Sequence, residues 1–301
     1  MRIIREKQQV GVQSMHYADY MFLIKVLKRN KKLESVCKKV ATCIANILCG
    51  TTPADACRLS LVSKVFRSAA ESDVVWERFL PSDIYQFPLL LNYGYAYAYA
   101  PKKALYLALA NRPIIIEQGT KSFQLHKKTG NKCYMLAARS LAMACANTHY
   151  YWIWITDPDS RFPEVADLRF VWSIVFRGVI NTLVLSPNTQ YVAILVFKMI
   201  YPESFYNCPM ELSVGILGGH GSTKFVCLDP IIKFPNDRVV GLQRPILRSD
   251  GWLEIEMGEF FNTDLEAEVQ MSVTEVMDDD NDDVNVKCGL FIEGIEIRPK
   301  E

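Results

Sequence analysis

The chain has 301 residues, of which 50% are hydrophobic, so it is long enough to form two domains with packed cores. Its 34 basic and 33 acidic residues nearly cancel, which argues against a protein that binds nucleic acid by neutralising phosphates over its whole surface. The charge is unevenly spread, however, because residues 1–40 are rich in lysine and arginine, whereas residues 278–283 read DDDNDD. A basic arm can bind an anionic partner, but we interpret residues 1–40 as a solvated N-terminal extension.

The cysteines, histidines and apolar runs indicate a soluble intracellular protein. Nine cysteines without a CxxC pair are typical of reduced cytosolic thiols. The four histidines lack metal-ligand spacing, so we expect no metal and no cofactor. The early apolar run at residues 20–27 is interrupted by Lys25 and is too short to span a bilayer. These features predict a protein of the cytoplasm or nucleus, with no membrane span and no nucleic-acid partner.

Residues 41–82 carry the signals of short, closely spaced helices. The run ATCIANILCG has apolar residues at helical spacing and ends at Gly50, a typical helix stop. A second helix is expected to begin with Thr52 as its cap and Pro53 in its first turn, and a third is expected to end at Pro81. The apolar positions are Ile44, Ile47 and Leu48 in the first helix, Leu59, Val62 and Phe66 on one face of the second, and Trp76 in the third.

So short a helical segment buries only a small core, and its remaining apolar ridges need another surface, most simply a partner helix. The run CIANILCGTTPADACRLSLVSKVFRSAAESDVVWERFLP resembles an F-box, the adaptor-binding module of cullin-type ubiquitin ligases. In that family the apolar side of the helices lies on a Skp-type adaptor, and the box usually opens with Leu-Pro, where this chain has Lys39-Val40. The adaptor-binding residues that the resemblance implies are Ile47, Leu48, Pro53, Leu59, Val62 and Trp76. The alternative is a helical packing unit without a partner.

Residues 83–125 read as a linker that contains one short helix. The alternating Tyr-Ala run before residue 101 fits either a strand or an irregular connector. A helix is expected from Lys102 to Leu109, and Pro113 prevents its continuation.

From about residue 131 the patterns are those of strands. Runs of β-branched and aromatic residues alternate with turn residues and have no helices between them, which favours an antiparallel sandwich or jelly roll. The alternation in GLFIEGIEIRP slips once at Gly294, which predicts a β-bulge. The expected strands lie at residues 191–200, 211–217, 224–230, 251–261, 267–276 and 289–299. The fold class is therefore α+β, with a small helical segment followed by a jelly-roll-like antiparallel β-sandwich.

Enzyme motifs are weak. GGHGSTK at residues 218–224 lacks the spacing of a phosphate-binding loop and lies between strands, so a hairpin turn is the better interpretation. Glu254 and Glu256 share one face of a single strand, which favours a solvated sheet face over the paired acids of a glycosidase. No Ser-His-Asp or Cys-His arrangement is apparent, and we expect a non-catalytic protein.

The C-terminal part resembles the phloem protein 2 family, plant lectin-type domains related to the tobacco agglutinin. The similarity runs from KCYMLAARSL through YYWIWITDPDSRFPEVADL and LRSDGWLEIEMGEFFN to EVQMSVTEV and GIEIRPK. The resemblance implies a β-sandwich that binds N-acetylglucosamine oligomers or N-glycan cores. It also implies sugar-binding roles for Trp152, Glu268 and Glu275. At two positions where relatives carry a stacking tryptophan, this chain has Cys145 and Val286.

The tryptophans lead to a prediction of their own. We expect Trp152 to be turned outward at the start of its strand, beside a sugar site, and Trp154 to pack inside the sandwich. Trp172 and Trp252 are expected in the core. Because Cys145 and Val286 offer no ring for stacking, binding of chito-oligosaccharides should be weak or absent.

Together the two resemblances imply a substrate-receptor subunit of an SCF-type ubiquitin ligase, which binds a Skp-type adaptor and cullin complex through its F-box. The sandwich would bind a glycan or glycoprotein that contains N-acetylglucosamine. The alternatives are an intracellular carbohydrate-binding lectin, or a protein-binding sandwich, that works outside a ubiquitin ligase. The expected domains are a basic extension (1–40), the F-box (41–82), a linker with a short helix (83–125) and a phloem-lectin-type sandwich (126–301).

Overall fold

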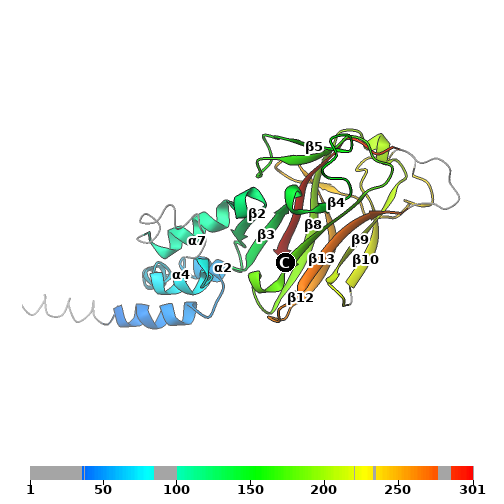
Figure 1. The fold of residues 1–301 in the computed structure, drawn as a ribbon. Coiled ribbons are helices and arrows are strands. Elements are labelled where there is room, and N and C mark those ends of the chain that lie inside the picture. Colours follow the sequence, from blue (N-terminus) through cyan, green and yellow to red (C-terminus); the bar gives the residue numbers. More distant parts are fainter. Residues whose placement is uncertain are drawn as a thin grey trace, which may run out of the picture. The chain divides into compact units, whose positions relative to one another are not determined.

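The computed structural model describes residues 36, 38–84, 100–219, 221–232, 235–276 and 286–300 (Figure 1). The chain divides into two compact units, residues 1–51 with 55–75, and residues 52–54 with 76–301. Most of the basic extension, the Tyr-Ala run and the acidic loop lie outside the described residues.

Residues 38–84 form short helices, as predicted. A first helix covers residues 38–48 and ends before Gly50, and the helices that follow are α2 (Pro53–Leu59), α3 (Lys64–Ala70) and α4 (Asp73–Phe79). The prediction of one helix face through Phe66 is wrong, because the chain turns at residues 60–63. Two serines cause this break. Ser60 Oγ donates to the Cys57 carbonyl at 2.6 Å, and the Ser63 side chain accepts from the Phe66 amide and caps α3.

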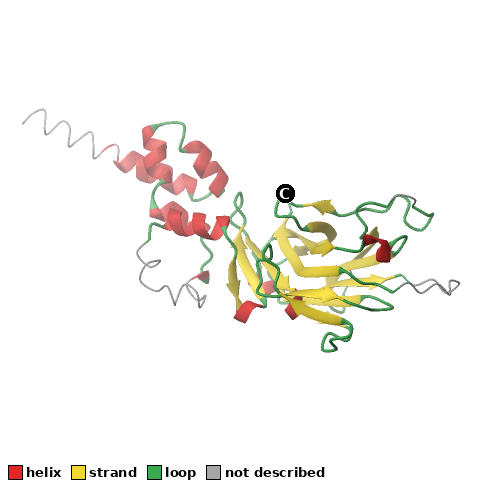
Figure 2. Cartoon of the chain, turned by 90° about the horizontal axis from the view of Figure 1, so that it is seen from above, coloured by secondary structure: helices red, strands yellow, loops and turns green. Residues whose placement is uncertain are grey.

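The second unit contains α7 (Lys102–Asn111) and two antiparallel sheets within its described residues. Figure 2 shows that the elements between the strands are loops and single helical turns. The nine-stranded sheet has the order β1-β2-β3-β14-β8-β12-β11, with β6 paired to β14 and β5 to β6. Its strands are β1 (Ile114–Ile116), β2 (Lys121–Leu125), β3 (Lys132–Ala137), β5 (Trp152–Ile155), β6 (Val165–Leu168), β8 (Thr189–Met199), β11 (Ile246–Leu247), β12 (Leu253–Asn262) and β14 (Leu290–Pro299).

The five-stranded sheet has the order β10-β9-β13-β7-β4. Its strands are β4 (Ala142–Met143), β7 (Val175–Asn181), β9 (Pro209–Ile216), β10 (Gly221–Cys227) and β13 (Glu268–Glu275). All six strands that we predicted are present, and the turn at residues 218–219 joins β9 and β10 in a hairpin.

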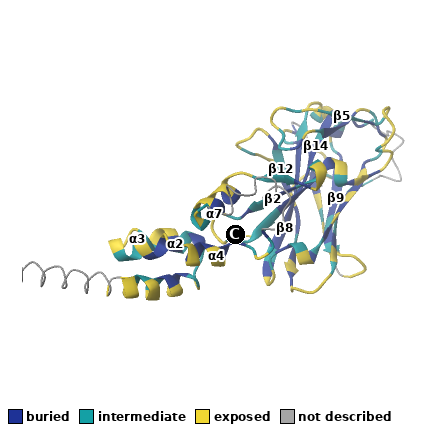
Figure 3. Cartoon of the chain, turned by 60° about the vertical axis from the view of Figure 1, so that its left-hand side comes forward, coloured by how far each residue is buried: buried dark blue, intermediate teal, exposed yellow. Residues whose placement is uncertain are grey.

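The two sheets pack face to face. Every residue of β8 from Tyr191 to Phe197 is buried, so this strand is covered on both sides (Figure 3). A Cβ atom on Gly178 of β7 would lie 2.9 Å from the side chains of both Leu136 and Leu141, so the layers meet closely at this glycine. The antiparallel sandwich is confirmed, whereas the finer jelly-roll description stays a prediction.

The predicted bulge is present in β14. The pairing with β8 shifts register between Ile292 and Gly294, which leaves Glu293 as the extra residue. A Cβ on Gly294 would collide with the Leu136 carbonyl, so only glycine permits the close approach of β3.

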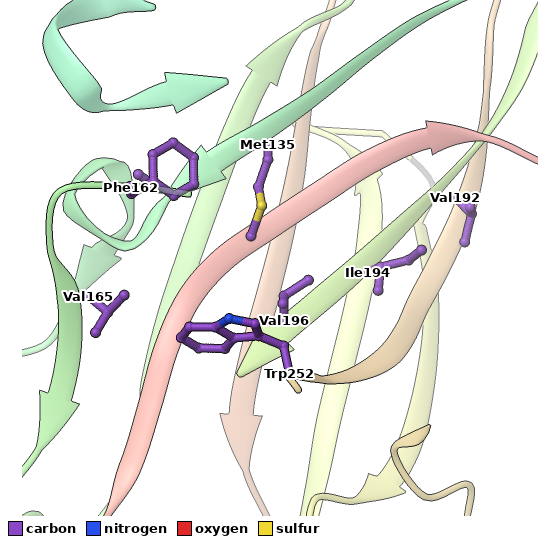
Figure 4. Packing of buried hydrophobic residues seen from close by; sticks show 8 residues of the cluster. Met135, Phe162, Val165, Val192, Ile194, Val196 and Trp252 are labelled. Atoms are coloured by element: carbon purple, nitrogen blue, oxygen red, sulfur yellow. The ribbon is translucent and has the colours of Figure 1, made fainter. Parts of the chain in front are cut away.

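A small second core covers the outer side of the nine-stranded sheet. Trp252 is fully buried there, as predicted, in a cluster with Phe162, Val196 and other residues (Figure 4). Its indole Nε1 donates to the Asp159 carbonyl at 3.1 Å, and Lys198 Nζ lies 4.5 Å from the ring centroid. The loop at residues 157–162 is thereby fixed to the sheet.

Candidate functional site

The first unit contains a groove of about 620 Å³ between the helix at residues 38–48 and the segment that carries α3. Alanines form part of its wall, which leaves room for the side chains of another helix. Lys38 and Lys64 also line the groove and contribute positive charge. The lining residues are Lys38, Ala41, Thr42, Ala45, Asn46, Lys64, Val65, Ser68, Ala69, Ser72 and Val74.

The predicted adaptor-binding residues fall into two groups. Ile47 is 69% exposed and Val62 is 67% exposed, so both are available to a partner. Leu48, Pro53 and Trp76 are buried and Leu59 is half-buried, so their contacts are mainly internal. Exposed apolar side chains that the helical pattern missed are Leu61 and Val74.

Trp76 has a clear structural role. Its ring contacts Phe79 at a centroid distance of 5.6 Å and Tyr106 at 5.1 Å, so it joins α4 to α7. The Tyr106 hydroxyl in turn donates to the His126 carbonyl at 3.0 Å. The last turn of the helical segment is therefore attached to the turn between β2 and β3.

An aromatic ladder lies on the loops of the sandwich and consists of Tyr151, Tyr150, Phe170 and Trp172. Successive ring centroids are 5.4, 5.2 and 5.4 Å apart. Tyr150 is 62% exposed and Trp172 is 53% exposed, so these rings present a surface rather than a core. The expectation that Trp172 packs in the core is wrong. A ladder of exposed rings with polar neighbours can stack on the C–H face of a sugar.

Trp152 is 2% exposed, so its predicted outward position is also wrong. It begins β5 in regular pairing with Leu168, without a bulge, and its Nε1 donates to the Ala144 carbonyl at 3.2 Å. Trp154 is half-buried, and the Arg139 guanidinium lies 3.7 Å from its ring centroid. Of the two rings, Trp152 is therefore the better packed.

Glu275 is buried and occupied by internal partners. Its Oε1 pairs with Lys287 Nζ at 2.8 Å and accepts from Cys208 Sγ at 3.3 Å, while Oε2 accepts from the Ile174 amide at 3.3 Å. Burial, with the nearby Glu275 carboxylate, raises the pKa of the Cys208 thiol to about 12. Glu275 thus connects β13 to the segment around Lys287.

The structure does not bring the predicted sugar-binding residues together. Glu268 and Glu275 are the two end residues of β13. At about 3.3 Å per residue, seven steps separate them by roughly 23 Å. Glu268 is exposed at the far end of that strand. One sugar ring cannot contact both carboxylates.

Cys145 and Val286 both lie near the aromatic ladder in the hydrogen-bonded loops. The Thr148 amide donates to the Cys145 carbonyl, and Thr148 precedes Tyr150 by two residues. On the other side, Lys287, which follows Val286, exchanges backbone hydrogen bonds with Val171. Cys145 and Val286 therefore adjoin the loops that hold the exposed rings. The sequence signal for the ladder was weak, because Tyr150 and Tyr151 belong to the strand-like run YYWIWI, whereas Phe170 and Trp172 belong to no alternating run.

Within the described ranges, no group of three or more His, Cys, Asp or Glu side chains is arranged to hold a metal ion. The helices in this part of the chain are also too short or too polar to cross a membrane.

Comparison with known proteins identifies the family. The model of the family described as phloem protein 2 matches residues 131–299. The chain belongs to the plant F-box proteins with a phloem protein 2 domain. The Arabidopsis thaliana protein named F-box protein PP2-B10 is 41% identical over 261 residues, which cover 85% of this chain and 91% of that protein. F-box protein SKIP3 of Arabidopsis thaliana is 38% identical over 262 residues, which cover 85% of this chain and 86% of that protein.

Solved structures show only distant similarity to this F-box phloem protein 2 chain. The Podospora anserina GH26-CBM35 β-(1,4)-mannanase matches 56% of this chain and 28% of its own, with 12% identity and a TM-score of 0.31. The match to the N-terminal endo-1,4-β-D-xylanase 10B of Clostridium thermocellum covers 55% of this chain and 27% of the xylanase chain, with 10% identity and a TM-score of 0.31. These scores carry no functional argument.

Proposed function

We propose that this F-box phloem protein 2 chain is a substrate-receptor subunit of an SCF-type ubiquitin ligase. In this proposal residues 1–40 are an extension, residues 41–82 bind a Skp-type adaptor, residues 83–125 link the parts, and residues 126–301 bind the target. The chain acts in the cytoplasm or nucleus as a non-catalytic receptor, without a cofactor and without nucleic acid.

The observation that carries the adaptor part of the proposal is the exposed apolar surface of the helical unit. Ile47, Leu61 and Val62 are each at least two-thirds exposed, so their apolar side chains are available to a partner. The groove beside the helix at residues 38–48 contributes two lysines, which favour an amphipathic partner helix with acidic residues at its margin.

Co-purification with a recombinant Skp-type adaptor tests this part. The double variant Ile47→Asp and Val62→Asp should lose the complex, because two charges would be buried in an apolar interface. Leu265→Asp is the matched control, since Leu265 is 71% exposed on the sandwich and its replacement should leave the complex intact. No complex of the unmodified chain at micromolar concentration would refute the ligase proposal and leave the intracellular lectin as the better alternative.

For the target we propose a glycan or glycoprotein that contains N-acetylglucosamine, bound on the aromatic ladder. Trp152 and Glu275 support the surrounding loops from beneath, and Glu268 lies outside this site. The exposed rings of Tyr150 and Trp172 support this assignment.

Binding to a glycan array, followed by calorimetry with the best glycan, tests the target. Trp172→Ala should weaken binding about thirtyfold, because truncation of an anchoring aromatic residue costs about 2 kcal/mol. Val179→Ala removes a partly exposed side chain on the outer face of β7 and should not change the affinity. Full glycan affinity in Trp172→Ala would exclude the ladder, and binding only to unglycosylated protein would favour the protein-binding alternative.

A further inference from the structure

A second, smaller pocket of about 240 Å³ lies at one end of the nine-stranded sheet. Asp167 on β6 pairs in register with Phe291 on β14, so their side chains project from the same side of the sheet. Leu168 and Ile292, the next residue of each strand, are fully buried. The pocket is therefore on the outer face of the sandwich, and the residues facing it include Asp167, Arg169, Tyr201, Cys288 and Phe291.

Gly289 holds the walls of this pocket in place. Its amide donates to the Leu168 carbonyl and its carbonyl accepts from the Ile200 amide, both at 2.8 Å. Its φ is +70°, and a Cβ there would lie 2.5 Å from the Tyr201 ring. Glycine is therefore required by both the backbone and the ring, and the Tyr201 ring lies directly against Gly289.

The polar part of the pocket is an ion pair between Asp167 and Arg169, which together carry no net charge. The Asp167 side chain is 5% exposed, and its Oδ2 accepts from Arg169 Nη1 at 3.1 Å. The Arg169 side chain is 56% exposed, so most of the guanidinium is accessible from the pocket side and from solvent. This one contact uses a single donor of the five that a guanidinium has and a single acceptor site of the carboxylate. A ligand therefore meets both donors and acceptors at one place.

We propose that this pocket binds a single pyranose ring through two neighbouring hydroxyls, one donating to Asp167 and one accepting from Arg169, with a C–H face of the sugar against Tyr201. Hydroxyls fit because each can both donate and accept a hydrogen bond. An ammonium group attracted by Asp167 also meets the Arg169 charge, and an anion attracted by Arg169 also meets the Asp167 charge, so neither gains the full strength of an ion pair. The pocket is smaller than the roughly 300–1,000 Å³ of sites that enclose drug-sized ligands, so it fits one ring rather than an oligomer.

This inference rests on the proposed function for the class of ligand but concerns a different surface. The residues that line the pocket do not include any of the four rings of the aromatic ladder, so variants can separate the two surfaces.

Cys288 provides a local readout, because its half-buried thiol lines the pocket. The full chain is treated with iodoacetamide, and modification of Cys288 is followed by peptide mass spectrometry with and without methyl β-N-acetylglucosaminide. At about three times its dissociation constant the glycoside should slow this modification about fourfold, since a quarter of the pockets remain free. The exposed Cys57, on α2, is the internal control and should react at an unchanged rate.

Arg169→Met should abolish the protection, and Asp167→Asn should weaken it. Trp172→Ala should leave the protection intact even where it abolishes glycan binding on the ladder, which distinguishes failure of this inference from failure of the proposed ladder site. Protection of Cys288 by sodium phosphate or methylammonium chloride instead of the glycoside would overturn the inference. So would unchanged protection by the glycoside in Arg169→Met.

Discussion

Replacing Lys287 by methionine should destabilise the sandwich strongly, although it changes no exposed surface. The Lys287 and Glu275 side chains are 5% and 6% exposed and lie 2.8 Å apart. Methionine keeps the approximate length of lysine but leaves the Glu275 carboxylate buried without a cation. Loss of one partner from a buried ion pair costs about 3–5 kcal/mol. For a domain of this size that corresponds to a decrease in melting temperature of about 6–20 °C.

Urea unfolding of Lys287→Met, Glu275→Leu and the double variant measures the effect. The double variant should recover most of the lost stability, because an apolar pair avoids the desolvation of both charges. Lys300→Met is the matched control, since Lys300 pairs with Glu259 at 2.6 Å but its side chain is 50% exposed, and its loss should hardly move the midpoint. A loss below about 1 kcal/mol in Lys287→Met, or a double variant less stable than both single variants, would refute the reasoning.

Three further outcomes are expected. Trp152→Ala should cost about 3–5 kcal/mol in urea unfolding, whereas Trp172→Ala should leave the midpoint nearly unchanged; equal losses would contradict their different burial. Gly178→Ala should lower stability by about 1–3 kcal/mol, because its methyl group overlaps two leucines of the interior, and an unchanged melting temperature would show that the layers can separate there. Burial alone would raise the pKa of Glu296, but the guanidinium groups of Arg161, Arg248 and Arg298 outweigh it and hold the pKa below its usual range. Because the pKa of Glu296 is lower in the folded than in the unfolded chain, its ionised carboxylate stabilises the fold at pH values above the unfolded pKa, and this stabilisation is lost as the pH falls through the folded pKa. Glu296→Gln should therefore lower the free energy of unfolding at pH 7 and much less at pH 3. An equal loss at both pH values would exclude this carboxylate as the source.

The fold could be predicted largely from local patterns. The continuous apolar run around Leu195 and the alternating run around Val273 both form strands, as expected, and the slip at Gly294 identified a bulge. The helical segment was predicted less well, because spacing alone does not show that the hydroxyls of Ser60 and Ser63 bond to the local backbone and interrupt the helix.

The tryptophans show why the site was harder to predict than the fold. The alternation of side chains along a strand correctly places Trp152 and Trp154 on one face of β5, but it does not predict which of the two rings other segments of the chain cover. The segment around Ala144 covers Trp152, whereas Trp154 is covered by Arg139, which Glu164 holds at 2.9 Å. Burial of each ring thus depends on residues from separate loops.

The same dependence on loops decides the roles of the residues that the phloem protein 2 resemblance singled out. Glu275 fits the family pattern by position, yet Lys287, which lies twelve residues further along the chain, determines that its carboxylate is an internal partner. Conversely, the exposed rings of Tyr150 and Trp172 lie in loops. The sandwich fixes the ends of these loops, but the side chains between them determine which rings are exposed, so strand periodicity alone could not locate this surface.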